Sequence, residues 1–341
     1  MLNKLKLKKM KFISKTFKLL PVLFLVFGLT ACSDDDDNND GPVAMETTVI
    51  DVALENNLTS LAAALEATGL VSTLQGPGPF TVFAPSNDAF TTFLTAKGVD
   101  LNNMSSAEEA LVTNVLLNHV IIGDNIASTE LVAAGSGYAK TGATGPNGEN
   151  LSLYFSTSNG VVFNGISEVT SADNTSTNGT VHIVDTVIDL PTLATFATSN
   201  PALSILVDAL AYADTGSPTV PYIATVSDNT AGPFTVFAPS NDAFVSLLDE
   251  LNLTALTDLD TDTVNSVLLY HIVGANVQSD ELSTGAVGTL GGSIDADVSN
   301  FTLTDQNGRI SNIVTSLVDI QSINGVVHVI DNVILPPPAA D

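Results

Sequence analysis

The most regular pattern of hydrophobic and polar positions is a twelve-residue stretch that occurs twice, at residues 79–90 and 233–244. Both stretches read PFTVFAPSNDAF, and they begin 154 residues apart. Within residues 80–84, Phe, Val and Ala point to one face of an extended chain and Thr and Phe to the other, which predicts a β-strand. Pro85 lacks the N–H group that a sheet requires, so we expect the strand to end there. We call this stretch the repeat segment.

A helix is expected directly after this strand. Ser86 and Ser240 are placed to cap it, and Asp88 and Asp242 fall in its first turn, where a carboxylate suits the positive end of the helix dipole. An identical segment that recurs over so long a period indicates two copies of one structural unit.

Helices are also expected on both sides of the repeat segment. Leucine and valine recur at helical spacing within residues 48–74, interrupted by Asn56-Asn57. A second helix is expected over residues 105–120, because Ser105 and Glu108 form a capping-box pattern.

Short strands follow the helices in each copy. Asn-Gly pairs, which favour hairpin turns, occur at residues 147–148, 159–160 and 307–308. The second copy keeps this order and adds an insertion at 214–231. The pattern predicts an α+β fold with one domain at residues 46–190, a second at 192–336, and a tail at 337–341.

The N-terminal pattern is that of an exported protein. Seven lysines in the first 18 residues precede an apolar run over residues 19–29 that is too short to span a bilayer as a helix. The sequence Leu-Thr-Ala-Cys ending at Cys32 resembles the lipobox of bacterial lipoproteins, in which the cysteine is lipidated. We therefore expect a signal peptide at residues 1–31 and a disordered acidic tether at 32–45. The alternative is a plain secretory signal with a coincidental cysteine.

The expected location is the cell envelope, with a lipid anchor in the outer membrane and the domains exposed at the surface or facing the periplasm. The acidic residues just after Cys32 also resemble the surface-export signal of Bacteroidetes lipoproteins. Without residues 1–31, three basic residues stand against 37 acidic ones, a net charge of −34. So acidic a surface repels nucleic acid and anionic lipid, so we expect no nucleic-acid partner and membrane attachment through acyl chains only.

No metal or cofactor site is expected. Residues 36–41 match the start of an EF-hand loop, but Thr47 stands where a bidentate glutamate is required. Asp258, Asp260 and Asp262 lack the turn glycine and are better interpreted as helix-capping carboxylates. The chain also lacks a G-x-S-x-G motif and a Gly-rich phosphate loop.

The four histidines occupy equivalent positions in the two copies, at His119, His182, His271 and His328. Metal ligation or general-base catalysis is one interpretation. The interpretation we favour is structural: His182 and His328 lie in apolar strand patterns, so we expect buried rings with satisfied nitrogens. The expected members of this structural polar core are Ser86, Asp88, His182, Ser240, Asp242 and His328.

Three landmarks now recur in the same order in both copies: the repeat segment, a histidine at a helix end, and the pattern Asn-Gly-x-Val-His-x-x-Asp at residues 178–185 and 324–331. We call the third landmark the closing segment. Together they resemble the fasciclin-like domain family over residues 46–336. The resemblance implies a pair of α+β domains, each with helices packed on a wedge of short, mostly antiparallel strands.

The resemblance also implies a non-catalytic adhesion or surface-binding role toward proteins. Tyr270 and His271 match the tyrosine–histidine motif that is the family's proposed contact for integrin-type receptors, whereas the first copy has Asn118 before His119. The alternatives are a matrix protein that binds carbohydrate or exopolysaccharide, and a hydrolase with a Ser-His-Asp set assembled across the fold.

Overall fold

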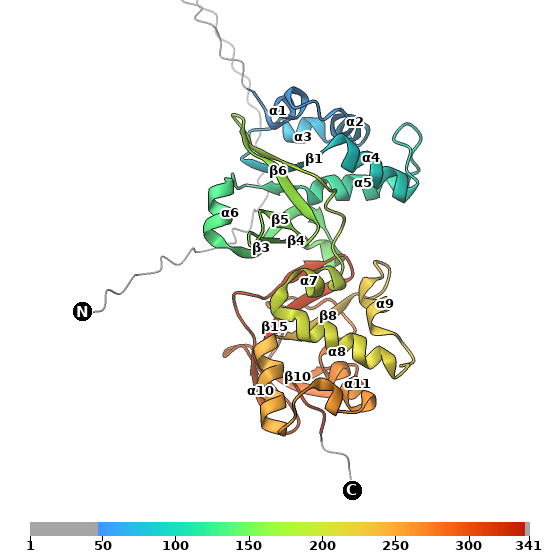
Figure 1. Cartoon of the computed structure of the whole chain (residues 1–341), viewed down its shortest axis with the longest axis vertical. Helices are drawn as coiled ribbons and strands as arrows, with labels where there is room; N and C mark the ends of the chain where they lie inside the picture. The colour runs from blue at the N-terminus through green and yellow to red at the C-terminus, as the bar shows by residue number, and fades with distance from the viewer. Residues whose placement is uncertain (1–46, 338–341) are drawn as a thin grey trace, which may run out of the picture. The chain divides into compact units, whose positions relative to one another are not determined.

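The computed structural model describes residues 47–337, which Figure 1 colours from blue to red. The predicted signal peptide at residues 1–31 and the predicted tether at 32–45, which includes Cys32, lie outside this range, as do residues 338–341 of the predicted tail. The first copy contains the helices α1 (Val49–Glu55), α2 (Thr59–Ala67), α3 (Val71–Leu74), α4 (Asn87–Lys97), α5 (Ser106–Asn118) and α6 (Ser128–Ala134) and the 3₁₀ turn η1 (Pro146–Gly148). Its strands are β1 (Phe80–Pro85), β2 (Val120–Ile122), β3 (Ser136–Thr144), β4 (Asn150–Ser156), β5 (Val162–Phe163), β6 (Ser167–Thr175) and β7 (Gly179–Val184).

The second copy repeats the order of helices and then strands. Its helices are α7 (Leu193–Ser199), α8 (Ser204–Thr215), α9 (Tyr222–Ser227), α10 (Asn241–Leu251) and α11 (Thr261–Tyr270), with the 3₁₀ turns η2 (Pro201–Leu203) and η3 (Leu256–Asp258). Its strands are β8 (Phe234–Pro239), β9 (Ile272–Val273), β10 (Gly285–Gly288), β11 (Ser293–Asp297), β12 (Thr302–Thr304), β13 (Ile310–Asn312), β14 (Ile320–Ser322) and β15 (Gly325–Ile330).

The strands form one large sheet in the first copy and two smaller sheets in the second. The first sheet has the order β2-β1-β7-β6-β5-β4-β3, and the other two have the orders β14-β15-β8-β9 and β10-β11-β12-β13. Among the named strands of residues 47–337, β1 with β7 and β8 with β15 are the parallel pairs, and the other pairs are antiparallel. The predicted α+β fold with mostly antiparallel strands is therefore confirmed.

The parallel pairs join the repeat segment to the closing segment. At the start of each pair the two backbones touch so closely that only glycine fits. A Cβ atom on Gly179 would lie 2.1 Å from the carbonyl oxygen of Phe80, and one on Gly325 would lie 2.2 Å from that of Phe234. Real Cβ atoms do not approach an oxygen so closely, so these glycines permit the pairing.

Both faces of the repeat-segment strand are buried, as its alternating pattern indicates. In β1, Val82 and Ala84 pack into the hydrophobic cluster formed with helices α1, α2, α4 and α5. Phe83 packs into a second cluster on the other face, with its ring centroid 4.1 Å from that of Phe163. The strand is therefore the centre of the first copy's core.

The predicted helix caps are confirmed, but two of the capping residues do not belong to a polar core. The Ser86 hydroxyl accepts the Ala89 N–H at 3.2 Å, and Ser240 makes the equivalent bond at 3.3 Å. Asp88 and Asp242 lie in the first helical turn but are exposed to solvent. Their place in the predicted polar core is wrong, because a first-turn carboxylate acts on the helix end and points to solvent.

The predicted insertion at residues 214–231 contains a helix of its own, α9. The carboxylate of Asp214, at the end of α8, accepts the backbone N–H groups of Tyr222 at 2.7 Å and Ile223 at 3.0 Å. This cap fixes α9 beside α8.

The two copies contact each other through buried polar groups and aromatic rings. Residues 47–337 lie within one compact unit. Ser152 accepts the backbone N–H of Gln321 at 2.9 Å, and both residues are buried. Tyr138 packs edge-on against Phe196 with ring centroids 5.6 Å apart.

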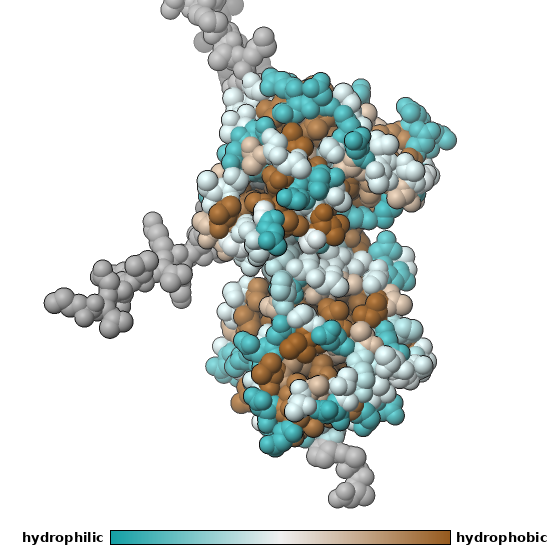
Figure 2. Space-filling model, in the orientation of Figure 1, coloured by the Kyte–Doolittle hydropathy of each residue, from teal (hydrophilic) through white to brown (hydrophobic). Residues whose placement is uncertain are grey.

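The surface mixes hydrophobic and hydrophilic side chains, as the visible face in Figure 2 shows. Within residues 47–337, no single helix is both long and apolar enough to cross a membrane. The bent helix pair 193–199 and 201–215 passes the same test by length and composition, with a bend of 103°.

Candidate functional site

The closing-segment histidines are fully buried and bonded to backbone on both sides. His328 faces Phe237 of the repeat segment, and its Nε2 donates to the Val277 carbonyl at 2.9 Å while Nδ1 accepts the Asp319 N–H at 3.3 Å. In the first copy, His182 makes the equivalent bonds at 2.9 and 3.2 Å. These bonds fix the neutral imidazole with the proton on Nε2.

These bonding partners differ from those that the sequence predicted for the histidines. Ser86, Asp88, Ser240 and Asp242 are expected to bond to His182 and His328 in a shared polar core, but none of the four bonds to a histidine ring. Loop carbonyl and N–H groups satisfy the rings instead.

The helix-end histidines are held in the opposite tautomer. Nδ1 of His271 donates to the Val267 carbonyl at 2.8 Å, and Nε2 accepts the Ile334 N–H at 3.0 Å. His119 makes the same pair of bonds at 2.7 and 2.9 Å. Burial lowers the pKa of both His119 and His271 to about 4, because a charged imidazolium would lose its hydration. Both rings are therefore neutral at pH 7.

Tyr270 and His271 are neighbours in the chain but expose little surface. Tyr270 is 7% and His271 2% exposed, and His119 is equally buried at 2%. Gly291 and Gly292 lie flat against the Tyr270 ring, since a Cβ on either would clash with it. Contact of these three residues with a partner stays a prediction, and the geometry supports a packing role for each.

The asparagine that begins the closing segment has a role that its Asn-Gly pattern did not reveal. The Asn178 amide donates to the carbonyls of Leu74 and Gly76, both at 2.8 Å, and its oxygen accepts the Val49 N–H at 2.8 Å. Asn324 makes the equivalent bonds in the second copy. The sequence signal was available, because asparagine stands at the same place in both copies.

Two aspartates that sequence reasoning missed complete the histidine clusters. Asp319 accepts the Ser279 hydroxyl at 2.6 Å and N–H at 2.7 Å, while its own N–H bonds to His328. Asp173 is placed in the same way against Ser128 and His182.

These clusters contain serine, histidine and aspartate, but in an order unsuited to nucleophilic catalysis. Each serine hydroxyl bonds to the carboxylate and not to the imidazole, so the imidazole is not placed to take its proton. Over residues 47–337, no three His, Cys, Asp or Glu side chains are grouped as a metal site. In each copy the cluster connects loops to the parallel strand pair, which is β1 with β7 in the first copy and β8 with β15 in the second.

Comparisons with known proteins identify the domain that each copy forms. The model of the fasciclin domain matches residues 56–191 and again residues 202–336. Protein sll1483 of Synechocystis is 33% identical over 146 residues, which are 43% of this chain and 74% of that protein. Transforming growth factor-beta-induced protein ig-h3 of Sus scrofa is 29% identical over 272 residues, 78% of this chain but only 36% of that protein.

Two further matches are named for the cell surface or for adhesion. The cell surface glycolipoprotein MPB83 of Mycobacterium bovis is 31% identical over 147 residues, 42% of this chain and 60% of that protein. A solved FAS1 domain pair from the insect cell adhesion molecule fasciclin I has 18% identity and a TM-score of 0.44, covering 83% of this chain and 94% of that one. Since the family model matches twice and covers more than half of the chain, this protein belongs to the fasciclin domain family and carries two copies of the domain.

Proposed function

We propose that this chain is a non-catalytic cell-envelope lipoprotein whose two fasciclin domains bind a protein partner at the cell surface or in the matrix. The observation that carries the proposal is the pair of fasciclin domains in one chain, together with its similarity to a cell surface glycolipoprotein. The predicted lipidation of Cys32 supports a membrane anchor.

The charges favour a basic partner surface. The part of the chain that the structure describes contains three basic residues, and each is occupied. Lys97 pairs with Asp189 at 2.8 Å, and Arg309 pairs with Glu250. Lys140 donates to the backbone carbonyls of Asn150 and Asp319. The remaining surface charge is acidic, so electrostatic attraction selects a cationic surface over an acidic polysaccharide.

Two domains in one chain also favour avidity. When both engage the same surface, the second contact forms at a high effective concentration and strengthens the first.

The anchor is tested by mass spectrometry of the membrane fraction. We expect the mature N-terminus at residue 32 with acyl chains attached, and we expect Cys32→Ala to release the protein from the membrane. An unmodified N-terminus at another residue would contradict the proposal.

The binding role is tested with the soluble Cys32→Ala protein on envelope and matrix preparations. A protein partner predicts that 0.5 M salt elutes the bound chain and that monosaccharides and oligosaccharides do not. Elution by sugar at low salt would favour the polysaccharide alternative. Ester hydrolysis by the purified protein would contradict a non-catalytic role.

A further inference from the structure

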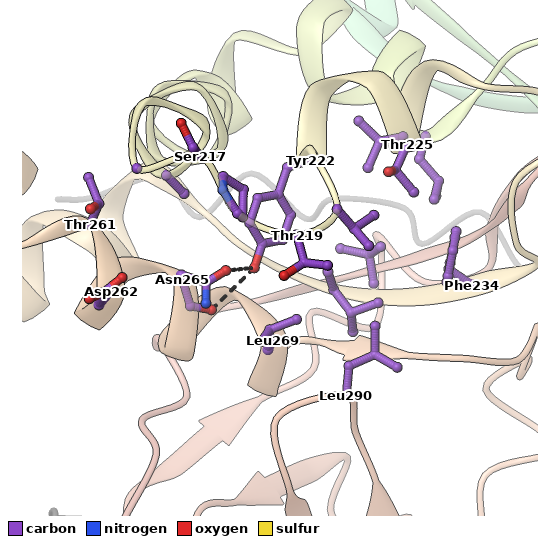
Figure 3. A pocket seen from close by; sticks show the side chains of 18 residues that line it. Ser217, Thr219, Tyr222, Thr225, Phe234, Thr261, Asp262, Asn265, Leu269 and Leu290 are labelled. Carbon is purple, nitrogen blue, oxygen red and sulfur yellow. Dashed lines mark hydrogen bonds between the residues drawn. The ribbon is translucent and has the colours of Figure 1, made fainter.

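The second copy contains a pocket whose lining includes none of the histidines. Its volume is about 610 Å³, within the roughly 300–1,000 Å³ typical of small-molecule sites. Figure 3 shows its lining, which comes from the helices α7, α8, α9 and α11, the strands β8 and β9, and the loops at residues 216–220 and at Leu290. Much of the wall belongs to the insertion at residues 214–231.

The interior and the rim of the pocket are mainly apolar. Val236, Leu269 and Ile272 line the inside, and Phe234 adds an aromatic face. Val220 of the insertion is 60% exposed and also lines the pocket, as does Leu290, which is 52% exposed. Large apolar side chains that stay this exposed around a hollow are typical of a binding site.

One polar pair faces this apolar lining. The Tyr222 ring extends from α9 to Asn265 on α11, and its hydroxyl donates to Asn265 Oδ1 at 2.7 Å (Figure 3). Burial raises the pKa of Tyr222 to about 12, so the phenol stays neutral and its oxygen keeps the capacity to accept a hydrogen bond. The Asn265 amide group adds N–H donors. The pair can therefore both accept from and donate to a hydroxyl or carbonyl group.

The charge of the lining restricts the ligand further. None of the residues that line the pocket is basic, and one, Asp262, is acidic. A carboxylate or phosphate would lose its hydration without gaining a cation, and Asp262 would repel it. The lining therefore favours an uncharged polar end on an apolar body.

We propose that this pocket binds a neutral single-chain amphiphile, such as a long-chain alcohol or the ester end of a neutral lipid. The chain lies along Val236, Leu269 and Ile272, and its oxygen meets Tyr222 and Asn265. None of the residues that line this site takes part in the predicted anchor or in the histidine clusters, so the proposal does not rest on either.

The test is a chain-length series measured by calorimetry on the soluble Cys32→Ala protein. For 1-octanol, 1-decanol and 1-dodecanol, affinity should rise about fourfold for each added CH₂ group. Decanoate at pH 7.5 should bind at least tenfold more weakly than 1-decanol. Affinity that is independent of chain length, or equal affinity for the carboxylate, would overturn the proposal.

Matched variants locate the site. Leu290→Asp should weaken 1-decanol binding at least tenfold, whereas Ile310→Asp, at an equally exposed residue outside the pocket, should change it less than twofold. Val220→Asp is the second rim variant, in case Leu290→Asp fails to fold. Tyr222→Phe should weaken 1-decanol binding by removing the hydroxyl. Rim variants that bind as tightly as Ile310→Asp would exclude this pocket as the site.

Discussion

Each buried histidine bonds to backbone atoms through both of its ring nitrogens. The bonds of His328 tie β15 to the loops at Val277 and Asp319. Serine, carboxylate and histidine are the residue types of a catalytic triad, yet here the imidazole is closed to solvent and to the hydroxyl. The main effect of removing such a ring should therefore be a loss of stability of the fold.

His328→Ala is expected to lower the free energy of unfolding by about 2–4 kcal/mol, from two orphaned backbone groups plus a cavity. Urea denaturation measures the change. The exposed Asp242→Asn variant is the control, with an expected loss below about 1 kcal/mol from the helix dipole alone. A His328→Ala protein as stable as the wild type would contradict the structural role.

Acid should destabilise the protein through His119 and His271. Burial lowers the pKa of both from 6.5 to about 4 in the folded state, so the unfolded chain binds more protons between these values. The stability that these sites confer is complete above pH 6.5 and falls as the pH drops toward 4, by up to about 3 kcal/mol per site. Urea unfolding at pH 7.5, 5.5 and 4.5 in 0.3 M salt checks this. A flat profile would show that the rings charge as easily in the folded state.

Most of the hydrogen-bond partners of individual residues could not be predicted from the sequence. Sequence indicated that the histidines are buried and bonded, but it named the wrong partners. A carbonyl or N–H of a distant loop carries no mark in the sequence, whereas serine and aspartate side chains attract attention. Asp173 and Asp319 were missed because the group that each offers to its histidine is a backbone N–H.

Among the elements, the pair of repeat-segment and closing-segment strands depends on a close backbone contact. Gly325 sits at φ +156°, with the Phe234 carbonyl oxygen where a Cβ would lie. Any side chain at this point pushes β15 away from β8. The first copy has the same restriction at Gly179.

Gly325→Ala should therefore cost about 3 kcal/mol or more, since the strands must separate or the backbone must bend. Thermal unfolding followed by circular dichroism measures the loss. Gly288→Ala is the control, because a Cβ at Gly288 meets no atom within 4 Å. Equal melting temperatures for the two variants would disprove the close-contact argument.

Local elements were largely predictable from sequence. The strand at 80–85, the caps at Ser86 and Ser105, and the Asn-Gly turn at 307–308 all follow from local patterns and are confirmed. The pairing of strands was not predictable, because identical repeat segments lie in a seven-stranded sheet in one copy and in a four-stranded sheet in the other. The pocket was not predicted either. Residues 214–231 had the composition of a Pro- and Gly-rich loop, so the helix α9, which helps to form the pocket, was not expected.

At the scale of the molecule, the contact between the copies includes polar atoms that are buried away from water as well as aromatic rings. Ser152 is 1% exposed and provides the acceptor for the Gln321 N–H. Such a bond is costly to leave unmade, because water cannot replace it. The copies should accordingly lose their structure together.

Ser152→Ala is expected to lower the unfolding free energy by about 1–3 kcal/mol by orphaning the Gln321 N–H. The wild type should unfold in one calorimetric transition, and the variant should show a broader or split one. A single, unshifted transition in Ser152→Ala would mean that this bond does not couple the copies.

The parallel pairing of β1 with β7 also constrains how the chain acquires its shape. The central strand is made early, but its neighbour lies about a hundred residues later, and contacts over such separations form slowly. A growing chain therefore cannot complete the sheet of the first copy until β7 has been made, and truncation before residue 179 leaves β1 paired with β2 alone. Such a chain can pass through a narrow channel for most of its synthesis, because the first copy completes its fold only after β7 has been made.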